Sequence, residues 1–228
     1  MSVPTQLVLP VGRQAEPTFD TFLGAGNREV VARLRDIAVH PQVCRLWLVG
    51  GAGFGKSHLL GALAAATRSL GRGAAEALLT GGSVDDLRAL AGVATVLVDS
   101  VDAVCGDARW EAALLQLCNE QHGAIVFTAA CHPAEAGIDL PDLRTRLAAA
   151  EVYRLASLLD ADRLILLGAR ARTLGIDLPE DVAAYLLARL PRDAGTLSAA
   201  IDALDLAAWR EQRRLTVPFV RAVLPDLP

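Results

Sequence analysis

Lysine is nearly absent from this 228-residue sequence, because Lys56 is the single lysine among 22 basic residues. Acidic residues number 26, so the formal net charge is −4. The charges are scattered rather than grouped in blocks, which argues against a chain-wide basic surface for a nucleic acid backbone. We therefore expect weak nonspecific binding to DNA.

Long apolar runs and closely spaced cysteines are missing too. No uncharged apolar run approaches the roughly 20 residues of a membrane span, and the opening MSVPTQLVLP has prolines and no basic start, unlike a signal peptide. The four cysteines lie far apart without metal-ligand spacing, so buried reduced thiols are the simplest interpretation. These absences predict a cytoplasmic protein without a membrane partner.

The chain divides into a tail, an alternating part and a helical part. Residues 1–18 carry three prolines and no helical periodicity, which predicts an extended tail. Over 19–156, apolar strands alternate with amphipathic helices, as in an α/β domain whose parallel sheet is covered on both faces. Strands are expected at 43–49, 75–79, 95–99 and 124–130. Residues 157–228 show helical periodicity only, which predicts a small all-helical domain.

A glycine-rich loop carries the most specific motif. Residues 50–57, GGAGFGKS, fit GxxxxGK[ST] between a predicted strand and a predicted helix. Such glycines let backbone amides surround phosphates at a helix N-terminus, Lys56 reaches the β and γ oxygens, and Ser57 holds Mg²⁺. The single lysine thus stands where a compact ammonium suits best. The predicted nucleotide-binding residues here are Gly50, Gly51, Ala52, Gly53, Phe54, Gly55, Lys56, Ser57 and His58.

The stretch TVLVDSVD, residues 95–102, bears on hydrolysis. Asp99 ends a predicted strand, and we expect it to bind Mg²⁺ directly or through water. Ser100 follows where a nucleotide-hydrolysing enzyme usually has a second acid, and its hydroxyl is a poor general base near neutral pH. Asp102 is a possible substitute whose reach the sequence does not define. These residues predict nucleotide binding with weak or no hydrolysis.

Several motifs, in this order, resemble the AAA+ family of the bacterial replication initiator DnaA, and most closely its shorter paralogues of the Hda type. The segments that match are PTFDTFLGAGN, GGAGFGKSHLL, TVLVDSVD, LPDLRTRL and RRLTVPFVRAVL. The resemblance implies a P-loop AAA+ domain over 19–156 and a helical lid over 157–228. Initiators continue into a helix-turn-helix domain beyond the lid, whereas this chain ends at Pro228, so we expect no sequence-specific DNA binding.

The same resemblance implies roles for three further positions. It places an arginine finger at Arg146, supplied in trans to a neighbouring subunit's nucleotide, with Arg144 as the rival. It places a nucleotide-sensing arginine at Arg192. Ala130 stands where the initiator usually has a polar or acidic sensor, which again predicts weak hydrolysis by the chain itself.

The predicted tail carries a last match. Gln6, Leu7, Leu9 and Pro10 resemble the peptide with which Hda proteins bind the β sliding clamp of DNA polymerase III, and such a peptide can dock into an apolar pocket. The resemblance implies a regulator that binds ADP or ATP with Mg²⁺, stimulates hydrolysis of DnaA-bound ATP and prevents re-initiation. Two alternatives stay open: a self-sufficient AAA+ ATPase or switch that associates with itself, and a DnaA-like initiation factor.

Overall fold

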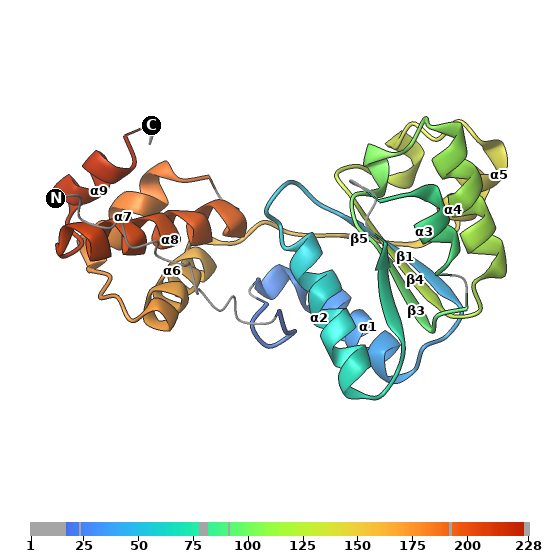
Figure 1. Ribbon diagram of the computed structural model, residues 1–228, viewed down its shortest axis with the longest axis horizontal. Coiled ribbons are helices and arrows are strands. Elements are labelled where there is room, and N and C mark those ends of the chain that lie inside the picture. Colours follow the sequence, from blue (N-terminus) through green and yellow to red (C-terminus); the bar gives the residue numbers. More distant parts are fainter. Residues whose placement is uncertain (1–16, 23, 78–81, 91, 192, 226–228) are drawn as a thin grey trace, which may run out of the picture.

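The computed structural model describes residues 17–22, 24–77, 82–90, 92–191 and 193–225. Within this part of the chain, a domain built on a sheet is followed by a group of helices (Figure 1). None of the helices described is both long enough and apolar enough to cross a membrane.

Parallel strands form the sheet of the first domain. They are β1 (Cys44–Val49), β2 (Ala74–Ala77), β3 (Thr95–Val98), β4 (Ala124–Ala129) and β5 (Glu151–Arg154). Their order across the sheet is β2-β3-β4-β1-β5. Because the strands are parallel, their carboxyl ends lie along one edge, so the residues that follow β1, β3 and β4 come together there.

Helices cover both faces of this sheet, as the sequence predicts. They are η1 (Ala25–Asn27), α1 (Arg28–Val39), α2 (Lys56–Ser69), α3 (Val84–Arg88), η2 (Val101–Ala103), α4 (Ala108–Glu120), η3 (Pro133–Glu135) and α5 (Pro141–Ala148). Alternate side chains of β1 enter two separate cores: Leu46 and Leu48 pack with α1 and α2, while Trp47 and Val49 pack with α3, α4 and α5. The strand alternation therefore divides the apolar interior into two layers.

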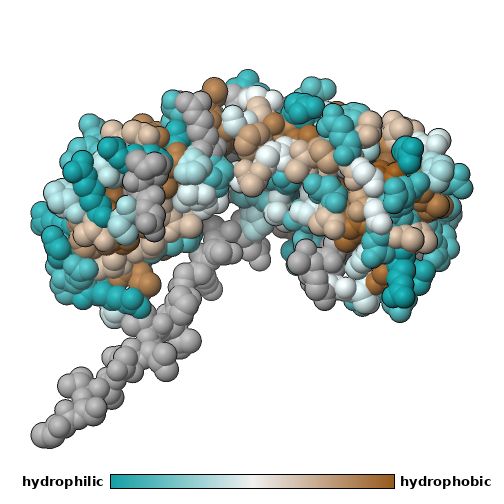
Figure 2. Space-filling model, turned by 90° about the horizontal axis from the view of Figure 1, so that it is seen from above, coloured by the Kyte–Doolittle hydropathy of each residue, from teal (hydrophilic) through white to brown (hydrophobic). Residues whose placement is uncertain are grey.

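The helical part has a core of its own. It consists of α6 (Asp160–Leu174), α7 (Glu180–Arg189), α8 (Ala194–Glu211) and α9 (Val217–Val223). Leu167, Leu186, Leu197 and Phe219 are among its buried residues. Figure 2 shows two lobes with hydrophilic residues around their outer ends. We call the first lobe the base and the helical one the lid.

The cysteines are less uniformly buried than the sequence predicts. Cys118 is buried, but Cys44, Cys105 and Cys131 are half-buried, and none of the four forms a disulfide. Burial raises the pKa of each thiol. The expected burial is therefore found at Cys118 alone, because the other three cysteines lie near the ends of strands and helices.

Candidate nucleotide site and arginine-bearing helix

The glycine-rich loop connects β1 to α2, and α2 begins at Lys56. Gly53 (φ 71°) and Gly55 (φ 87°) adopt the left-handed backbone conformation that favours glycine. Space also requires a glycine at position 55, since a Cβ there would lie 2.6 Å from a ring carbon of Phe22. The loop therefore turns tightly at the N-terminus of a long helix, which is a favourable place for phosphate.

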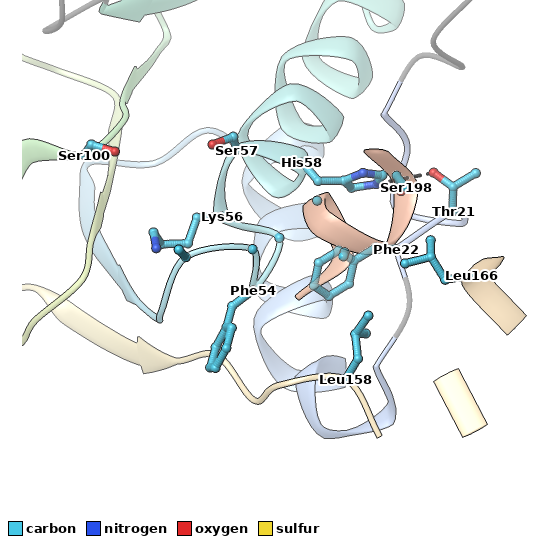
Figure 3. A pocket seen from close by; sticks show the side chains of 15 residues that line it. Thr21, Phe22, Phe54, Lys56, Ser57, His58, Ser100, Leu158, Leu166 and Ser198 are labelled. Atoms are coloured by element: carbon cyan, nitrogen blue, oxygen red, sulfur yellow. Dashed lines mark hydrogen bonds between the residues drawn. The ribbon is translucent and has the colours of Figure 1, made fainter. Parts of the chain in front are cut away.

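A cavity of about 480 Å³ adjoins this loop and is lined by both lobes. Figure 3 shows Lys56, Ser57 and Ser100 on one side of it, and Phe22 and Leu166 on the other. A polar side next to an apolar side suits a phosphate group and a flat ring, respectively. Of the predicted loop residues, the lining includes Ala52, Gly53, Phe54, Gly55, Lys56, Ser57 and His58.

Several lining residues were not among the sequence predictions. Thr21, Phe22, Leu158, Leu166, Ala194, Gly195 and Ser198 join the cavity from the N-terminal segment, the connection between the lobes and the lid. His58 is held beside them, since its Nε2 lies 3.0 Å from the carbonyl oxygen of Thr18 and 3.3 Å from the Thr21 hydroxyl. The sequence signal for Thr21 and Phe22 was their place in PTFDTFLGAGN, one of the segments that resemble the DnaA family.

The Lys56 ammonium is folded back onto its own loop. It donates hydrogen bonds to the carbonyl oxygens of Gly50 (2.5 Å) and Gly51 (2.9 Å). Burial lowers the pKa of Lys56, while the nearby carboxylates of Asp102 and Asp99 oppose that shift. A phosphate group would give this partly buried cation an anionic partner in place of neutral carbonyls.

Ser57 and Asp99 meet as the metal prediction requires. The Ser57 hydroxyl donates to Oδ2 of Asp99 at 2.7 Å, and the buried Thr128 hydroxyl donates to Oδ1. The Ser100 N–H donates to Thr128 Oγ1 at 2.9 Å, which fixes the turn that follows β3. Mg²⁺ prefers oxygen ligands and often takes only one or two from protein when phosphate supplies others. The hydroxyl and carboxylate therefore fit a magnesium ion bound together with nucleotide.

Asp102 lies closer to the site than its sequence position indicates. Ser100 adopts a left-handed conformation (φ 55°, ψ 47°) that is uncommon for a residue with a side chain, so the chain turns sharply into η2. The Asp102 carboxylate then accepts a hydrogen bond from the Ala130 N–H at 3.0 Å. One acid is thus present where Ala130 replaces the expected sensor, and its charge acts on Lys56.

The two rival arginines on α5 differ in their partners. Arg144 donates to the carbonyl oxygen of Ile138 from Nε (3.1 Å) and Nη2 (2.8 Å), with a weaker contact to Asp139 (3.4 Å). Arg146 is exposed and forms no hydrogen bond or ion pair with any residue that the structure describes. The Arg146 guanidinium is therefore available to a partner molecule, whereas that of Arg144 is engaged within its own chain.

Arg192 and the tail residues Gln6, Leu7, Leu9 and Pro10 lie outside the described residues. The two residues that follow Arg192 in the sequence nevertheless connect the lid to the glycine-rich loop. Asp193 caps α8 by accepting from the Thr196 N–H at 2.7 Å, and the Ala194 N–H donates to the Gly53 carbonyl at 3.1 Å. The start of α8 is therefore attached directly to the glycine-rich loop.

Several solved structures have a fold similar to that of this chain. Domain III of DnaA from Thermotoga maritima aligns with a TM-score of 0.81 and 20% identity over 93% of this chain and 97% of that one. AMPPCP-bound DnaA from Aquifex aeolicus gives 0.68 and 18% over 86% and 67%. RuvB from Thermotoga maritima, a Holliday junction branch migration motor, gives 0.70 and 13% over 92% and 71%. The fold is that of an AAA+ protein, with a parallel sheet and a helical lid.

A family model refines this class. Residues 160–224 match the model described as the Hda lid domain. Together with the DnaA-like fold, this match supports the predicted resemblance: the base and lid have the fold of DnaA domain III, and the lid is similar to that of Hda.

Proposed function

We propose that this chain regulates replication initiation by stimulating hydrolysis of the ATP bound to DnaA. The Hda lid match and the DnaA-like fold support the relation to DnaA. The observation that carries the mechanism is the Arg146 guanidinium on α5, which is exposed and has no hydrogen bond or ion pair with the described residues, whereas Arg144 binds its own chain. An arginine finger neutralises charge that develops on the transferred phosphoryl group, with typical accelerations of about 10³ to 10⁵.

The chain's own nucleotide has a structural role in this proposal. Loop 50–57 binds the phosphates of ADP or ATP through its amides and Lys56, and Ser57 and Asp99 would hold Mg²⁺, which neutralises phosphate charge when bound. Residues of both lobes line the cavity, so a bound nucleotide fixes the lid relative to the base. ADP favours the form that acts on DnaA.

The N-terminal tail, in this proposal, binds the sliding clamp. Gln6, Leu7, Leu9 and Pro10 bind the β sliding clamp of DNA polymerase III, which brings the chain to replicated DNA in the cytoplasm without reading a sequence itself. The clamp-binding side chains are one amide and two leucines, suited to an apolar pocket with a polar rim.

Phosphate release from ATP tests the proposal in three reactions: this chain alone, DnaA alone, and both together with DNA-loaded clamp. We expect little release by the chain and much faster release by the mixture. Arg146→Ala should abolish the stimulation while nucleotide and clamp binding persist. Arg109→Ala, at an exposed arginine of α4, is the matched control and should stimulate as the unchanged chain does. Full stimulation by Arg146→Ala would refute the finger assignment.

One observation favours a second candidate, an ATPase that acts without DnaA. The Asp102 carboxylate, from η2, accepts a hydrogen bond from the Ala130 N–H just after β4 and acts electrostatically on Lys56. An acid is therefore present near the phosphate-binding loop. On this alternative, the isolated chain turns over ATP strongly and Asp102→Asn abolishes the turnover. On the first proposal, ATP turnover by the isolated chain stays low, both without a substitution and with Asp102→Asn.

A further inference from the structure

Glu111 is a buried anion outside the nucleotide site. It lies on α4 and is 1% exposed. Its carboxylate accepts hydrogen bonds from the N–H groups of Gly106 (2.8 Å), Asp139 (2.9 Å) and Leu140 (2.6 Å). Burial alone would raise the pKa of Glu111, but these bonds and the Arg144 charge hold it below its usual value. The side chain is therefore ionised inside an otherwise apolar layer.

Two of the three donors belong to the segment that begins the arginine-bearing helix. α4 and α5 lie side by side on one face of the sheet (Figure 1). Leu140 is the N-cap of α5, and its apolar side chain forms no capping hydrogen bond. Glu111 reaches across from α4 and binds the backbone there with charge-assisted hydrogen bonds. The start of α5 is thus attached to α4.

Arg144 holds the same segment through its carbonyl groups. Its guanidinium donates to the carbonyl oxygen of Ile138, the residue before Asp139, whose N–H donates to Glu111. The segment 138–140 is therefore fixed by an anion on its N–H groups and by a cation on its carbonyl groups. Leu143 and Leu147 are buried on one side of α5, whereas Arg146 is exposed.

We infer that Glu111 is the positioning residue for Arg146. Its carboxylate sets where α5 begins and how the helix is oriented, so that the guanidinium is presented at a fixed place to a phosphate bound by a neighbouring molecule. The inference rests on the proposed function. Glu111 contacts neither the nucleotide loop nor the residues expected to bind Mg²⁺, so its buried charge has a structural role at the start of α5. Arg144 then helps to position Arg146 and is not a second arginine finger.

Glu111→Gln separates positioning from simple loss of structure. The amide has nearly the same size, but its NH₂ group faces an N–H donor, so at least one hydrogen bond and the negative charge are lost. Glu120→Gln is the matched control, since Glu120 is exposed on the same helix and, among the described residues, accepts a hydrogen bond only from the Gln116 side chain. Both variants are compared at a temperature well below their unfolding transitions.

The measurement is stimulated ATP hydrolysis by DnaA with DNA-loaded clamp, as a function of the concentration of this chain. We expect Glu111→Gln to lower the maximal rate about tenfold or more, because small displacements of a catalytic group can cost about 10²-fold. The half-saturating concentration and the affinity for ADP should change less than about twofold, since this segment lies apart from the nucleotide cavity. Glu120→Gln should match the unchanged chain.

A maximal rate for folded Glu111→Gln equal to that of the unchanged chain would overturn the inference, and so would a loss seen only in the half-saturating concentration. If the glutamine variant does not fold, Glu111→Asp takes its place: it keeps the charge, shortens the reach and should also lower the maximal rate. Failure of the proposed function gives a different result, in which Arg146→Ala itself stimulates fully.

Discussion

The base and the lid each bury one charged side chain among the described residues, Glu111 (1% exposed) and Arg163 (2% exposed). Glu111 accepts from backbone N–H groups at the start of α5. Arg163 donates to the carbonyl oxygens of Leu187 (3.0 Å) and Leu190 (2.9 Å) at the end of α7. The difference in sign follows helix polarity, because a helix leaves N–H groups unpaired at its start and carbonyl groups unpaired at its end.

Each buried charge binds backbone groups that lie shortly before an arginine that we assign to nucleotide chemistry. Glu111 fixes the backbone six residues before Arg146, and Arg163 fixes it two residues before Arg192. The two buried side chains differ in how many of their polar atoms have hydrogen-bond partners. Both oxygens of Glu111 have partners, whereas Nε of Arg163 is buried without one among the described residues. Among the described residues, the guanidinium of Arg163 also forms an ion pair with Asp160 at 3.0 Å, so the two buried charges differ only in the one N–H of Arg163 that has no acceptor.

The largest expected effect on stability comes from Arg163→Met. The methionine fills most of the space, but the carbonyl groups of Leu187 and Leu190 lose their donors inside the lid. Each buried unpaired polar group costs about 1 to 3 kcal/mol, so we expect a loss of about 3 kcal/mol in the free energy of unfolding. Urea denaturation measures it. Arg172→Met, at an exposed position of the same helix, should change stability by less than about 0.5 kcal/mol.

Glu111→Gln should cost less, about 2 kcal/mol, since the amide retains one acceptor for the backbone donors. The same denaturation series measures it. A loss equal to or above that of Arg163→Met would contradict the predicted order of the two stability losses, and a loss below about 0.5 kcal/mol would show that the carboxylate contributes little to the fold.

The pH dependence sharpens this prediction. The folded-state pKa of Glu111 lies below its usual value, so its stabilisation is fully present above the unfolded-state pKa and is lost as the pH falls through the folded-state pKa. The difference in unfolding free energy between the unchanged chain and Glu111→Gln should therefore be constant near neutral pH and shrink in acid. A difference that grows in acid would contradict an ionised Glu111.

Local motifs predicted one part of this molecule well, and contacts distant in sequence decided the rest. The strand, loop and helix around Lys56 follow from eight adjacent residues, so the sequence sufficed there. The cavity's Phe22 and Ser198 come from segments far apart in the chain, and no local pattern joins them. β5 has three exposed residues of four, which leaves no alternation to detect.

Glu111 illustrates an overlooked signal. It shares a helical face with the apolar residues Leu114 and Cys118, three and seven positions further on. A charged residue on the apolar face of a predicted helix is rarely buried without partners. The position alone thus indicated a buried carboxylate, but its donors, Asp139 and Leu140, became known only from the fold.

The smallest effect that we predict concerns Gly53, where base and lid meet. A Cβ at this position would lie 2.0 Å from the Cβ of Asp193, so Gly53→Ala must displace the start of α8 from the loop. Because lid residues line the nucleotide cavity, we expect ADP affinity to fall about tenfold, equivalent to about 1.4 kcal/mol. Isothermal titration calorimetry measures it.

Gly71→Ala is the control that separates this contact from backbone strain. Gly71 has nearly the same φ, 69° against 71°, but no atom lies within 4 Å of a Cβ built there. Both variants carry the left-handed strain of about 1 to 2 kcal/mol in stability, while only Gly53→Ala moves the lid. Equal ADP affinities in the two variants would show that nucleotide binding does not depend on the contact between Gly53 and α8. A selective loss of ADP affinity in Gly53→Ala would show that the contact between the glycine-rich loop and the start of α8 contributes to nucleotide binding.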